Sequence, residues 1–330
     1  MRAVLLVDAH RLELVDLAEP EPATGEVVVR VDGCGICGSD LSSYKVGLFT
    51  DAVPGHEFSG TVEAVGDDVT GWSSGDRTVV DPKMPCGVCE DCQRGAAWRC
   101  AIALTAGLGF ARNGAFAERV IVPAHLLHRL PDALALREAC LAEPLSVAIH
   151  GVNRAPIAQG PAVVIGLGPI GLFTVAVLRA RGVQPIIGVD PVADRRRLAL
   201  DLGASNTTET AAEVRAAVEP APVVFECSGF APVLHTAADL VAPGGTMVML
   251  GVPFGDATVA PLMWVTREIT IAGSIASSEQ EFRDSIDMLA ADPSLARVVT
   301  RRVALDEVPA VFEDLLAPSS GGKVVVDPRL

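Results

Sequence analysis

The sequence predicts an α/β protein that combines a mostly β domain with a second domain built on a doubly wound parallel sheet. Its 330 residues exceed what one hydrophobic core usually supports, so two domains are expected. The pattern also changes near residue 146: short β segments and turns rich in Gly and Pro precede it, and strands alternating with helices follow it. Half of the residues are apolar and only 4% are aromatic, so the cores must consist mainly of Val, Leu, Ile and Ala.

Each element is predicted from its local pattern. In the first part, an apolar run suited to a buried strand covers 27–31, and an alternating run that ends at a glycine covers 60–66. In the second part, apolar runs predict strands at 162–165, 185–190, 223–226 and 246–250, and helices are predicted at 170–181 and 195–202. The tail adds helices at 280–291 and near 307–316 and a final strand at 323–326. We therefore expect domains over 1–146 and 147–277, with residues 278–330 completing the first.

The charge and the apolar pattern exclude several classes of partner. A formal net charge of −15 argues against nucleic acid and anionic membrane surfaces. The first apolar run is too short for a signal peptide and is broken by Asp8 and His10, and no stretch reaches the roughly 18 to 20 apolar residues that span a bilayer. We expect a soluble cytoplasmic protein, in which the eight cysteines serve metal binding or catalysis rather than disulfides.

A glycine-rich run, GLGPIG, follows a predicted strand and opens a predicted helix, which favours a dinucleotide site. Gly166 allows the tight turn, Gly168 lets the backbone approach a pyrophosphate, and Gly171 lets the helix pack closely on the strand. Pro169 and Ile170 begin the helix, whose free N–H groups attract phosphates. The alternative is an ordinary glycine turn.

Asp190 ends the next predicted strand, nineteen residues after Gly171. A carboxylate at this place accepts hydrogen bonds from the ribose hydroxyls and repels a 2′-phosphate, so NAD is favoured over NADP. The nearby Arg195 and Arg196 leave NADP open, since either side chain could turn inward to meet that phosphate. The alternative is a surface aspartate without a ligand.

Four cysteines lie close together in the chain, in an expected metal-binding lobe over 83–103. Cys86, Cys89, Cys92 and Cys100 follow the pattern CxxCxxCx7C. Four thiolates form the closed tetrahedral site that zinc prefers for structural purposes, and no position is left for a substrate. An iron–sulfur cluster or a redox disulfide pair would be the alternatives.

A second set of metal-binding residue types is scattered over the first part of the chain. Cys37, His56, Glu57 and Glu143 each have an ordinary interpretation alone, as filler, surface or turn residues. Together they supply one thiolate, one imidazole and one or two carboxylates, a plausible set for a catalytic zinc with an open position. Cys34 forms CxxC with Cys37, but we expect it to pack in the core.

At this point the motifs resemble those of a known family, the zinc-containing medium-chain dehydrogenases, which include alcohol, sorbitol, butanediol and threonine dehydrogenases. No single motif is specific, but the combination is, and it runs nearly end to end. The matching segments are CGSD at 37–40, GHEFSGTVEAVG at 55–66, the four-cysteine lobe at 86–100, EPLSVAIHGV at 143–152, GLGPIG at 166–171 and ECSG at 226–229.

The resemblance implies a GroES-like catalytic domain formed by both chain ends, with a Rossmann domain inserted. It implies two zinc ions per chain, one structural and one catalytic. The catalytic zinc would lie at Cys37 and His56, with Glu57 and Glu143 in or next to its coordination shell. Ser39 matches the residue that takes the proton of the substrate hydroxyl.

The resemblance also extends the expected cofactor and substrate contacts. Dinucleotide contacts are predicted at Arg195, Cys227, Gly251, Val252, Ile275 and Lys323, and Lys323 matches a basic residue that reaches the pyrophosphate in some members. Candidates for the substrate pocket that sequence cannot place are Ser42, Phe49, Leu108, Phe110 and Ile275.

Two features refine the expected activity. Glu143 followed by Pro144 is similar to the sorbitol and polyol branch, because plain alcohol dehydrogenases often have Cys at the first position. Many relatives carry His where Ser42 stands, at the outer end of a proton relay, so here the relay could pass through water, a ribose hydroxyl or Tyr44. The expected function is reversible, NAD-linked oxidation of a secondary alcohol or polyol by a homodimer or homotetramer.

Other functions stay open on the sequence alone. A dehydrogenase of a hydroxy amino acid or an aminocyclitol would use the same parts. A zinc-free reductase on the same fold would lack the ligands Cys37, His56 and Glu57, which are present. A non-catalytic zinc- or nucleotide-binding protein would have no use for an open metal site.

Overall fold

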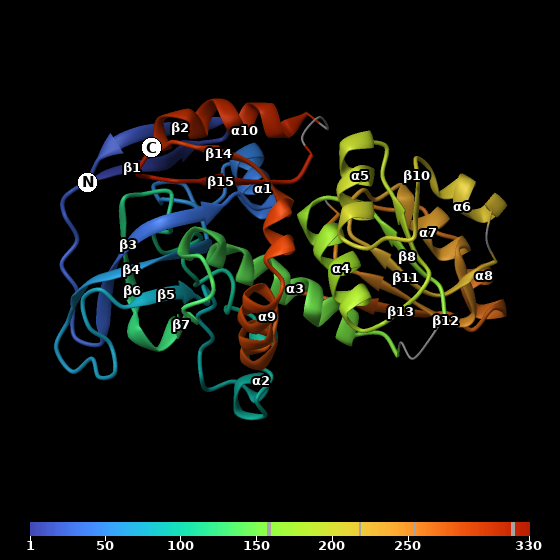
Figure 1. Cartoon of the computed structure of the whole chain (residues 1–330), viewed down its shortest axis with the longest axis horizontal. Coiled ribbons are helices and arrows are strands. Elements are labelled where there is room, and N and C mark those ends of the chain that lie inside the picture. Colours follow the sequence, from blue (N-terminus) through green and yellow to red (C-terminus); the bar gives the residue numbers. More distant parts are fainter. Residues whose placement is uncertain (157–159, 218, 254, 318–320) are drawn as a thin grey trace. The chain divides into compact units, whose positions relative to one another are not determined.

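The chain divides into two compact units (Figure 1). The computed structural model describes residues 1–156, 160–217, 219–253, 255–317 and 321–330. The first unit joins both chain ends, Met1–Glu143 and Ser278–Leu330, and the second contains Pro144–Ser277. The division after Glu143 falls three residues before the boundary expected at 146, so Glu143 belongs to the first unit.

A mostly antiparallel sheet forms the centre of the first unit, and its described strands follow the order β14, β15, β3, β4, β5, β7. They are β3 (Glu26–Gly35), β4 (Glu57–Val65), β5 (Arg77–Val80), β7 (Leu127–Arg129), β14 (Val299–Val303) and β15 (Lys323–Val326), while β6 (Arg119–Pro123) also pairs with β3. β15 runs antiparallel to β3 with Val326 opposite Cys34, so the last strand of the chain joins the sheet of its first strands.

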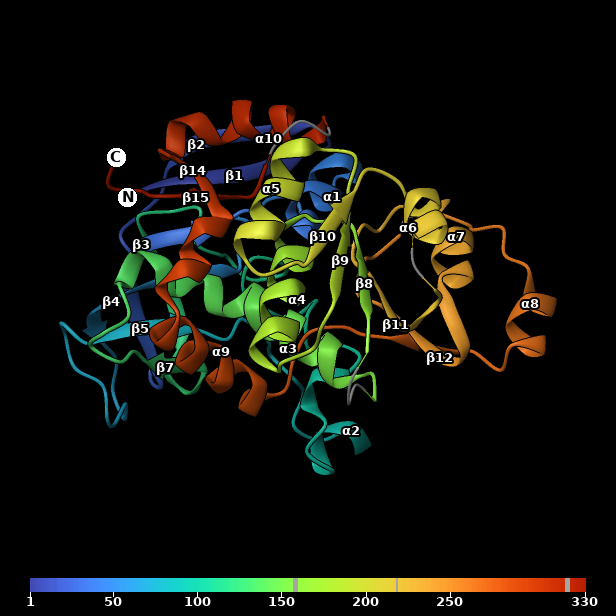
Figure 2. The ribbon, with the colours of Figure 1, turned by 45° about the vertical axis from the view of Figure 1, so that its right-hand side comes forward.

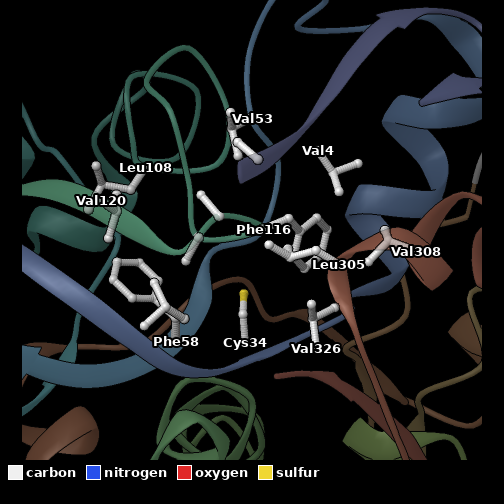
Figure 3. Close-up of a cluster of buried hydrophobic side chains, with 14 of the residues drawn as sticks. Val4, Cys34, Val53, Phe58, Leu108, Phe116, Val120, Leu305, Val308 and Val326 are labelled. Carbon is white, nitrogen blue, oxygen red and sulfur yellow. The ribbon is translucent and has the colours of Figure 1, made fainter. Parts of the chain in front are cut away.

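Smaller elements complete the first unit around one apolar core. β1 (Arg2–Asp8) and β2 (Arg11–Asp16) form a hairpin, and the helices are α1 (Gly38–Val46), α2 (Glu90–Gln93), α9 (Glu279–Ala291) and α10 (Val308–Leu316). Phe58, Phe116 and Phe312 are fully buried in the core cluster. Figure 3 shows the Cys34 side chain directed into this cluster, where it packs as the sequence analysis expected.

The second unit is built on a parallel sheet, whose described strands follow the order β10, β9, β8, β11, β12, β13. They are β8 (Ala162–Ile165), β9 (Ile186–Val189), β10 (Asn206–Thr208), β11 (Ala221–Glu226), β12 (Val241–Met249) and β13 (Thr270–Gly273). The direction of the order reverses between β8 and β11, which is where such sheets bind ligands beyond the carboxyl ends of the strands. The predicted α/β fold class, with its doubly wound parallel sheet, is confirmed.

Helices connect the strands of this sheet. They are α4 (Pro169–Ala180), α5 (Ala193–Asp201), α6 (Ala211–Ala217), α7 (Val233–Asp239) and α8 (Pro261–Thr266), and α3 (Ala142–Asn153) precedes the first strand. Figure 2 shows α4 and α5 on one side of the strands and α6 and α7 on the other. None of the described helices has both the length and the apolar character that a bilayer span requires.

The structure differs from the sequence expectations at two elements. β12 begins at Val241, five residues before the predicted strand, because Val241 pairs with Ala221 ahead of a register shift that contains Pro243-Gly244-Gly245. Because Gly and Pro are unfavourable within regular strands, a strand that contains them is not predicted from its residue pattern. The sequence pattern predicts turns where α1 lies, since only Asp40 and Tyr44 on this helix are buried and no apolar stripe marks it as a helix.

Candidate functional site

Two antiparallel strands bring three predicted site residues together. Cys37 follows β3 and caps the N-terminus of α1, while His56 precedes β4 and Glu57 begins it. The register places Gly35 opposite Glu57, so the segments on either side of this pair meet. One sulfur, one imidazole nitrogen and one carboxylate oxygen, from Cys37, His56 and Glu57, all lie within 4.8 Å of one another.

Asp40 holds two of these residues in place. Its Oδ2 accepts a hydrogen bond from the backbone N–H of Cys37 at 2.9 Å, and its Oδ1 lies 3.4 Å from His56 Nδ1. Burial alone lowers the pKa of His56, but the Asp40 carboxylate and the Cys37 thiol together raise it well above the ordinary value. Sequence analysis treated Asp40 only as part of CGSD and missed this role, although its spacing of three residues from Cys37 is a helix-capping signal.

Lys323 compensates the buried charge of Glu57. Its Nζ lies 2.7 Å from Oε1 and 2.6 Å from Oε2 of Glu57, and it also donates to the carbonyl oxygen of Ile36 at 2.9 Å. Burial disfavours the ammonium ion, but the Glu57 carboxylate raises the pKa of Lys323 overall, so Lys323 keeps its positive charge. In the structure, Lys323 therefore forms an ion pair with Glu57. Its expected contact with a pyrophosphate stays a prediction.

Glu143 stands beside this group but outside the set of three. It lies in the first turn of α3, and burial raises the pKa of its carboxyl to about 7; among its neighbours, His56 opposes that rise and Glu57 adds to it. Among the described residues, the group whose ligand atoms lie within 4.8 Å of one another consists of Cys37, His56 and Glu57, and it does not include Glu143. Direct binding of a metal by Glu143 therefore stays a prediction.

The donors fit a zinc ion. A thiolate, an imidazole and a carboxylate are the ligand types that zinc accepts, and three protein donors leave a fourth position for another ligand. Ser39 Oγ lies in the first turn of α1, is buried, and has no hydrogen-bond partner within the described residues. Because a buried hydroxyl is costly to leave unpaired, Ser39 Oγ is available to a group that enters the site.

The two residues considered for the outer relay are engaged elsewhere. Ser42 Oγ donates to the carbonyl oxygen of Gly38 at 2.9 Å, one turn earlier in α1. The Tyr44 hydroxyl donates to the carboxylate of Glu313 in α10, and burial together with this carboxylate raises the pKa of Tyr44 to about 12. Tyr44 thus belongs to the packing between α1 and α10, and the structure gives no support to a relay through it.

Aromatic side chains cover one side of His56. The Phe110 ring lies 4.8 Å from the His56 ring and is tilted by 30°, and Phe49 contacts Phe110 edge to face at 5.7 Å. Of the pocket candidates, Phe110 contacts His56, Phe49 contacts Phe110, and Leu108 is buried in the core. Phe49 has a positive φ of 57°, which is unusual for a bulky residue.

The four cysteines of the lobe converge as their spacing predicts. Their sulfur atoms all lie within 4.8 Å of one another, with Cys89 and Cys92 at 3.4 Å and Cys86 and Cys92 at 4.0 Å. Tetrahedral zinc–thiolate geometry, with bonds of about 2.3 Å, gives sulfur separations of about 3.8 Å, so the lobe fits a zinc ion. Backbone N–H groups of Val88 and Cys89 lower the pKa of Cys86 to about 6, which favours the thiolate that metals bind.

In the second unit, the glycine run forms the turn between β8 and α4. Gly168 caps α4 and Pro169 starts it, while Ile170 and Gly171 complete the first turn. A Cβ on Gly171 would lie closer than 3.0 Å to the carbonyl oxygen of Gly166, so only glycine permits this packing. The N–H groups at the start of α4 are then free to bind an anion.

Asp190 lies directly after β9 and is buried. Its Oδ2 accepts from the backbone N–H of Leu167 at 2.8 Å, and its Oδ1 accepts from Val192 at 2.8 Å. The Arg195 guanidinium lies 3.5 Å from Oδ2. Asp190 therefore braces the glycine turn, and its carboxylate retains lone pairs for ribose hydroxyls.

The other predicted cofactor residues divide into two groups. Val252 and Ile275 follow β12 and β13 and are 59% and 47% exposed, as expected of side chains that a ligand would cover. The thiol of Cys227 instead faces Thr174 Oγ1 in α4 at 3.8 Å, so its side chain packs below the glycine turn.

Comparison with known proteins gives consistent matches over the whole chain. Residues 23–132 match the family model described as alcohol dehydrogenase GroES-like domain, and residues 169–291 match the one described as zinc-binding dehydrogenase. The chain is 33% identical to D-altritol 5-dehydrogenase of Agrobacterium fabrum over 94% of its length and 95% of that protein. It is 31% identical to a D-xylulose reductase A of Neosartorya fischeri, over 95% and 93% of the two chains.

Solved structures agree with these matches. A zinc-binding dehydrogenase from Sinorhizobium meliloti 1021, bound to NADP, superimposes with a TM-score of 0.91 at 32% identity and covers 99% of both chains. The 2R,3R-butanediol dehydrogenase of Bacillus subtilis superimposes with a TM-score of 0.88 at 29% identity, also over 99% of both chains.

The close contact between Gly35 and Glu57 yields a prediction. A Cβ on Gly35 would overlap Glu57 Oε2, so Gly35→Ala must displace the carboxylate from Lys323. If Cys37, His56 and Glu57 bind a zinc ion together, the variant should hold less zinc than the native protein and lose about 1–3 kcal/mol of stability, as measured by zinc content and denaturant unfolding. Gly38→Ala is the matched control, since a Cβ there meets no atom within 4 Å. Equal zinc content in the two variants would contradict this role of Glu57.

Proposed function

Because the chain belongs to the zinc-binding medium-chain dehydrogenase family, we propose that it oxidises a secondary alcohol of the polyol class to a ketone by hydride transfer to a nicotinamide dinucleotide. The observation that carries this proposal is the convergence of Cys37, His56 and Glu57, which offers one donor fewer than a closed zinc site needs. The reverse reaction, ketone reduction, would use the same residues.

We assign the residues around the site as follows. Cys37 and His56 would bind a catalytic zinc ion, with Glu57 or Glu143 as a third protein ligand, and the four-cysteine lobe would bind a second, structural zinc. The catalytic ion would supply Lewis acidity that lowers the pKa of the substrate hydroxyl. The Asp40 carboxylate, 3.4 Å from His56 Nδ1, would orient the imidazole of a metal-bound His56, and a ligand held in this way keeps its geometry and basicity.

Ser39 is assigned the first proton transfer. Its Oγ is buried and unpaired, and would accept the proton of the substrate hydroxyl as that group becomes acidic. Since Ser42 and Tyr44 are bound elsewhere, the proton would continue to water or to a ribose hydroxyl. The phenylalanine pair, Phe49 and Phe110, would exclude bulk water from one side of the site.

The polyol class is supported by the polarity of the site and by relatives. Glu143 adds a carboxylate next to His56 and Glu57, which suits a substrate with a second hydroxyl group more than a long apolar alcohol. Two similar proteins are named for D-altritol and D-xylulose.

Loss of the Cys37 thiolate tests the assignment of the catalytic metal. Cys37→Ala should remove one of two zinc ions per chain and at least 99% of turnover in a polyol assay, because the site loses its thiolate ligand. Binding of NADH, measured by its fluorescence, should persist. Cys140→Ala is the control, because that buried thiol lies outside both sets of ligands. Full turnover by a Cys37→Ala enzyme that holds a single zinc would refute the assignment.

For the dinucleotide, we propose NAD. The Asp190 carboxylate would repel a 2′-phosphate, although Arg195 at 3.5 Å moderates that repulsion. We expect kcat/KM to favour NAD by at least about tenfold, equivalent to about 1.4 kcal/mol, and Asp190→Asn to shift the ratio toward NADP. Arg195→Ala should shift it toward NAD. Equal or better use of NADP by the native enzyme would overturn the preference.

We also propose that the protein forms a homo-oligomer through the second unit. β13 is the last strand of the described sheet, and α8 exposes Leu262 and Val265, which are 72% and 74% accessible. A second copy placed across a two-fold axis would cover both the strand edge and these side chains.

Light scattering tests this association. The native protein should have a mass at least twice the 34.3 kDa of one chain, and Leu262→Glu combined with Val265→Glu should reduce it. Leu14→Glu, on an exposed position of β2 in the other unit, serves as the control. A monomeric native protein would contradict this part of the proposal.

A further inference from the structure

Glu226 is a buried acid in the second unit that the chemistry above does not use. It ends β11, the strand that lies between β8 and β12, and its residue exposure is 0%. Charged side chains are rarely buried to this extent unless they are paired. Its carboxylate must therefore interact with something at the carboxyl edge of the sheet.

The partners of this carboxylate lie two and three residues further along the chain, at Ser228 and Gly229. Oε1 accepts hydrogen bonds from the N–H of Ser228 at 2.7 Å and from the N–H of Gly229 at 3.2 Å, and the Ser228 hydroxyl also donates to it. Gly229 has a positive φ of 64°. Successive N–H groups in such a turn form a small anion-binding concavity, and Glu226 fills it with a carboxylate of the chain itself.

The second carboxylate oxygen lies against a glycine. Oε2 has no hydrogen-bond partner within the described residues, and a Cβ on Gly251 would lie 2.7 Å from it. Burial raises the pKa of Glu226, and its hydrogen bonds to Ser228 and Gly229 oppose that rise. The carboxylate is thus enclosed between the turn after β11 and the end of β12.

This turn also touches the glycine run of the dinucleotide site. A Cβ on Gly166 would lie 2.6 Å from the backbone nitrogen of Ser228, and a Cβ on Gly251 would overlap Gly229. The backbone at Ser228 and Gly229 therefore fits between two glycines, one of which opens the GLGPIG turn. A shift of this backbone would change the shape of the carboxyl edge of β8, β11 and β12, next to the glycine turn.

We propose that Glu226 is a positioning residue for the dinucleotide: its carboxylate fixes the Ser228–Gly229 backbone against Gly166 and Gly251, and so sets the form of the binding crevice. This inference rests on the proposed function, because it concerns the same cofactor site. Glu226 does not contact the cofactor and takes no part in hydride transfer. Its effect depends on a side chain long enough to accept hydrogen bonds from the N–H groups of Ser228 and Gly229.

Two substitutions test this inference, because one removes the charge of Glu226 and keeps its length, and the other keeps the charge and shortens the side chain. Glu226→Gln keeps a carbonyl oxygen at the same distance, so we expect NADH affinity within about threefold of native. Glu226→Asp keeps the charge but shortens the side chain by one methylene, so both N–H bonds are lost and we expect about tenfold weaker NADH binding. Glu209→Ala removes an exposed carboxylate of the same unit and is the control. Fluorescence titration with NADH gives the affinities, and kcat should change less than KM.

Chemical rescue adds a measurement whose result would not change if Glu226 only stabilised the fold. In Glu226→Ala, formate should occupy the concavity formed by the two N–H groups and restore part of the NADH affinity, while chloride at equal ionic strength should not. If Glu226→Ala does not fold, the Gln and Asp variants decide. Native affinity in Glu226→Asp, or loss of affinity in Glu226→Gln with retention in Glu226→Asp, would overturn the inference. A native protein that fails to bind NADH would instead refute the proposed function.

Discussion

The first unit depends on the buried ion pair between Lys323 and Glu57. Lys323 begins the last strand of the chain and Glu57 begins β4, so one interaction connects residues 266 positions apart to the candidate metal site. Removing either partner would leave a buried charge without compensation, which typically costs about 3–5 kcal/mol. The pairing of β15 with β3 therefore also determines how Glu57 is oriented. A change that disturbs this part of the fold would also disturb the candidate metal site.

A common arrangement underlies both sites. In each unit, a buried carboxylate accepts backbone N–H groups and thereby holds a functional segment: Asp40 fixes the Cys37 segment, and Asp190 braces the glycine turn through Leu167. Asp40 lies behind the groups that would meet a ligand, whereas Asp190 would brace the glycine turn and also meet the ribose hydroxyls itself. Hydrogen bonds to a charged acceptor are stronger than hydrogen bonds to a neutral acceptor. Such bonds keep a segment rigid while charge develops on a bound substrate.

Much of the fold and site could be predicted, because the signals were local. The apolar run 162–165, the glycines at 166 and 171 and the four-cysteine spacing each encode their structure within a few residues. The contacts of Lys323 and Tyr44 could not be predicted, since their partners Glu57 and Glu313 are each more than 260 residues away. The same holds for Gly35: its necessity comes from a carboxylate across the sheet, which no pattern around residue 35 reveals.

The central claim is that Cys37, His56 and an acidic side chain hold a metal ion distinct from that of the cysteine lobe. Anomalous diffraction at the zinc edge, from crystals of protein that turns over a polyol, tests it most directly. We expect two peaks per chain, one among Cys86, Cys89, Cys92 and Cys100 and one in contact with Cys37 and His56. A single peak in the lobe of such an active preparation would contradict the account.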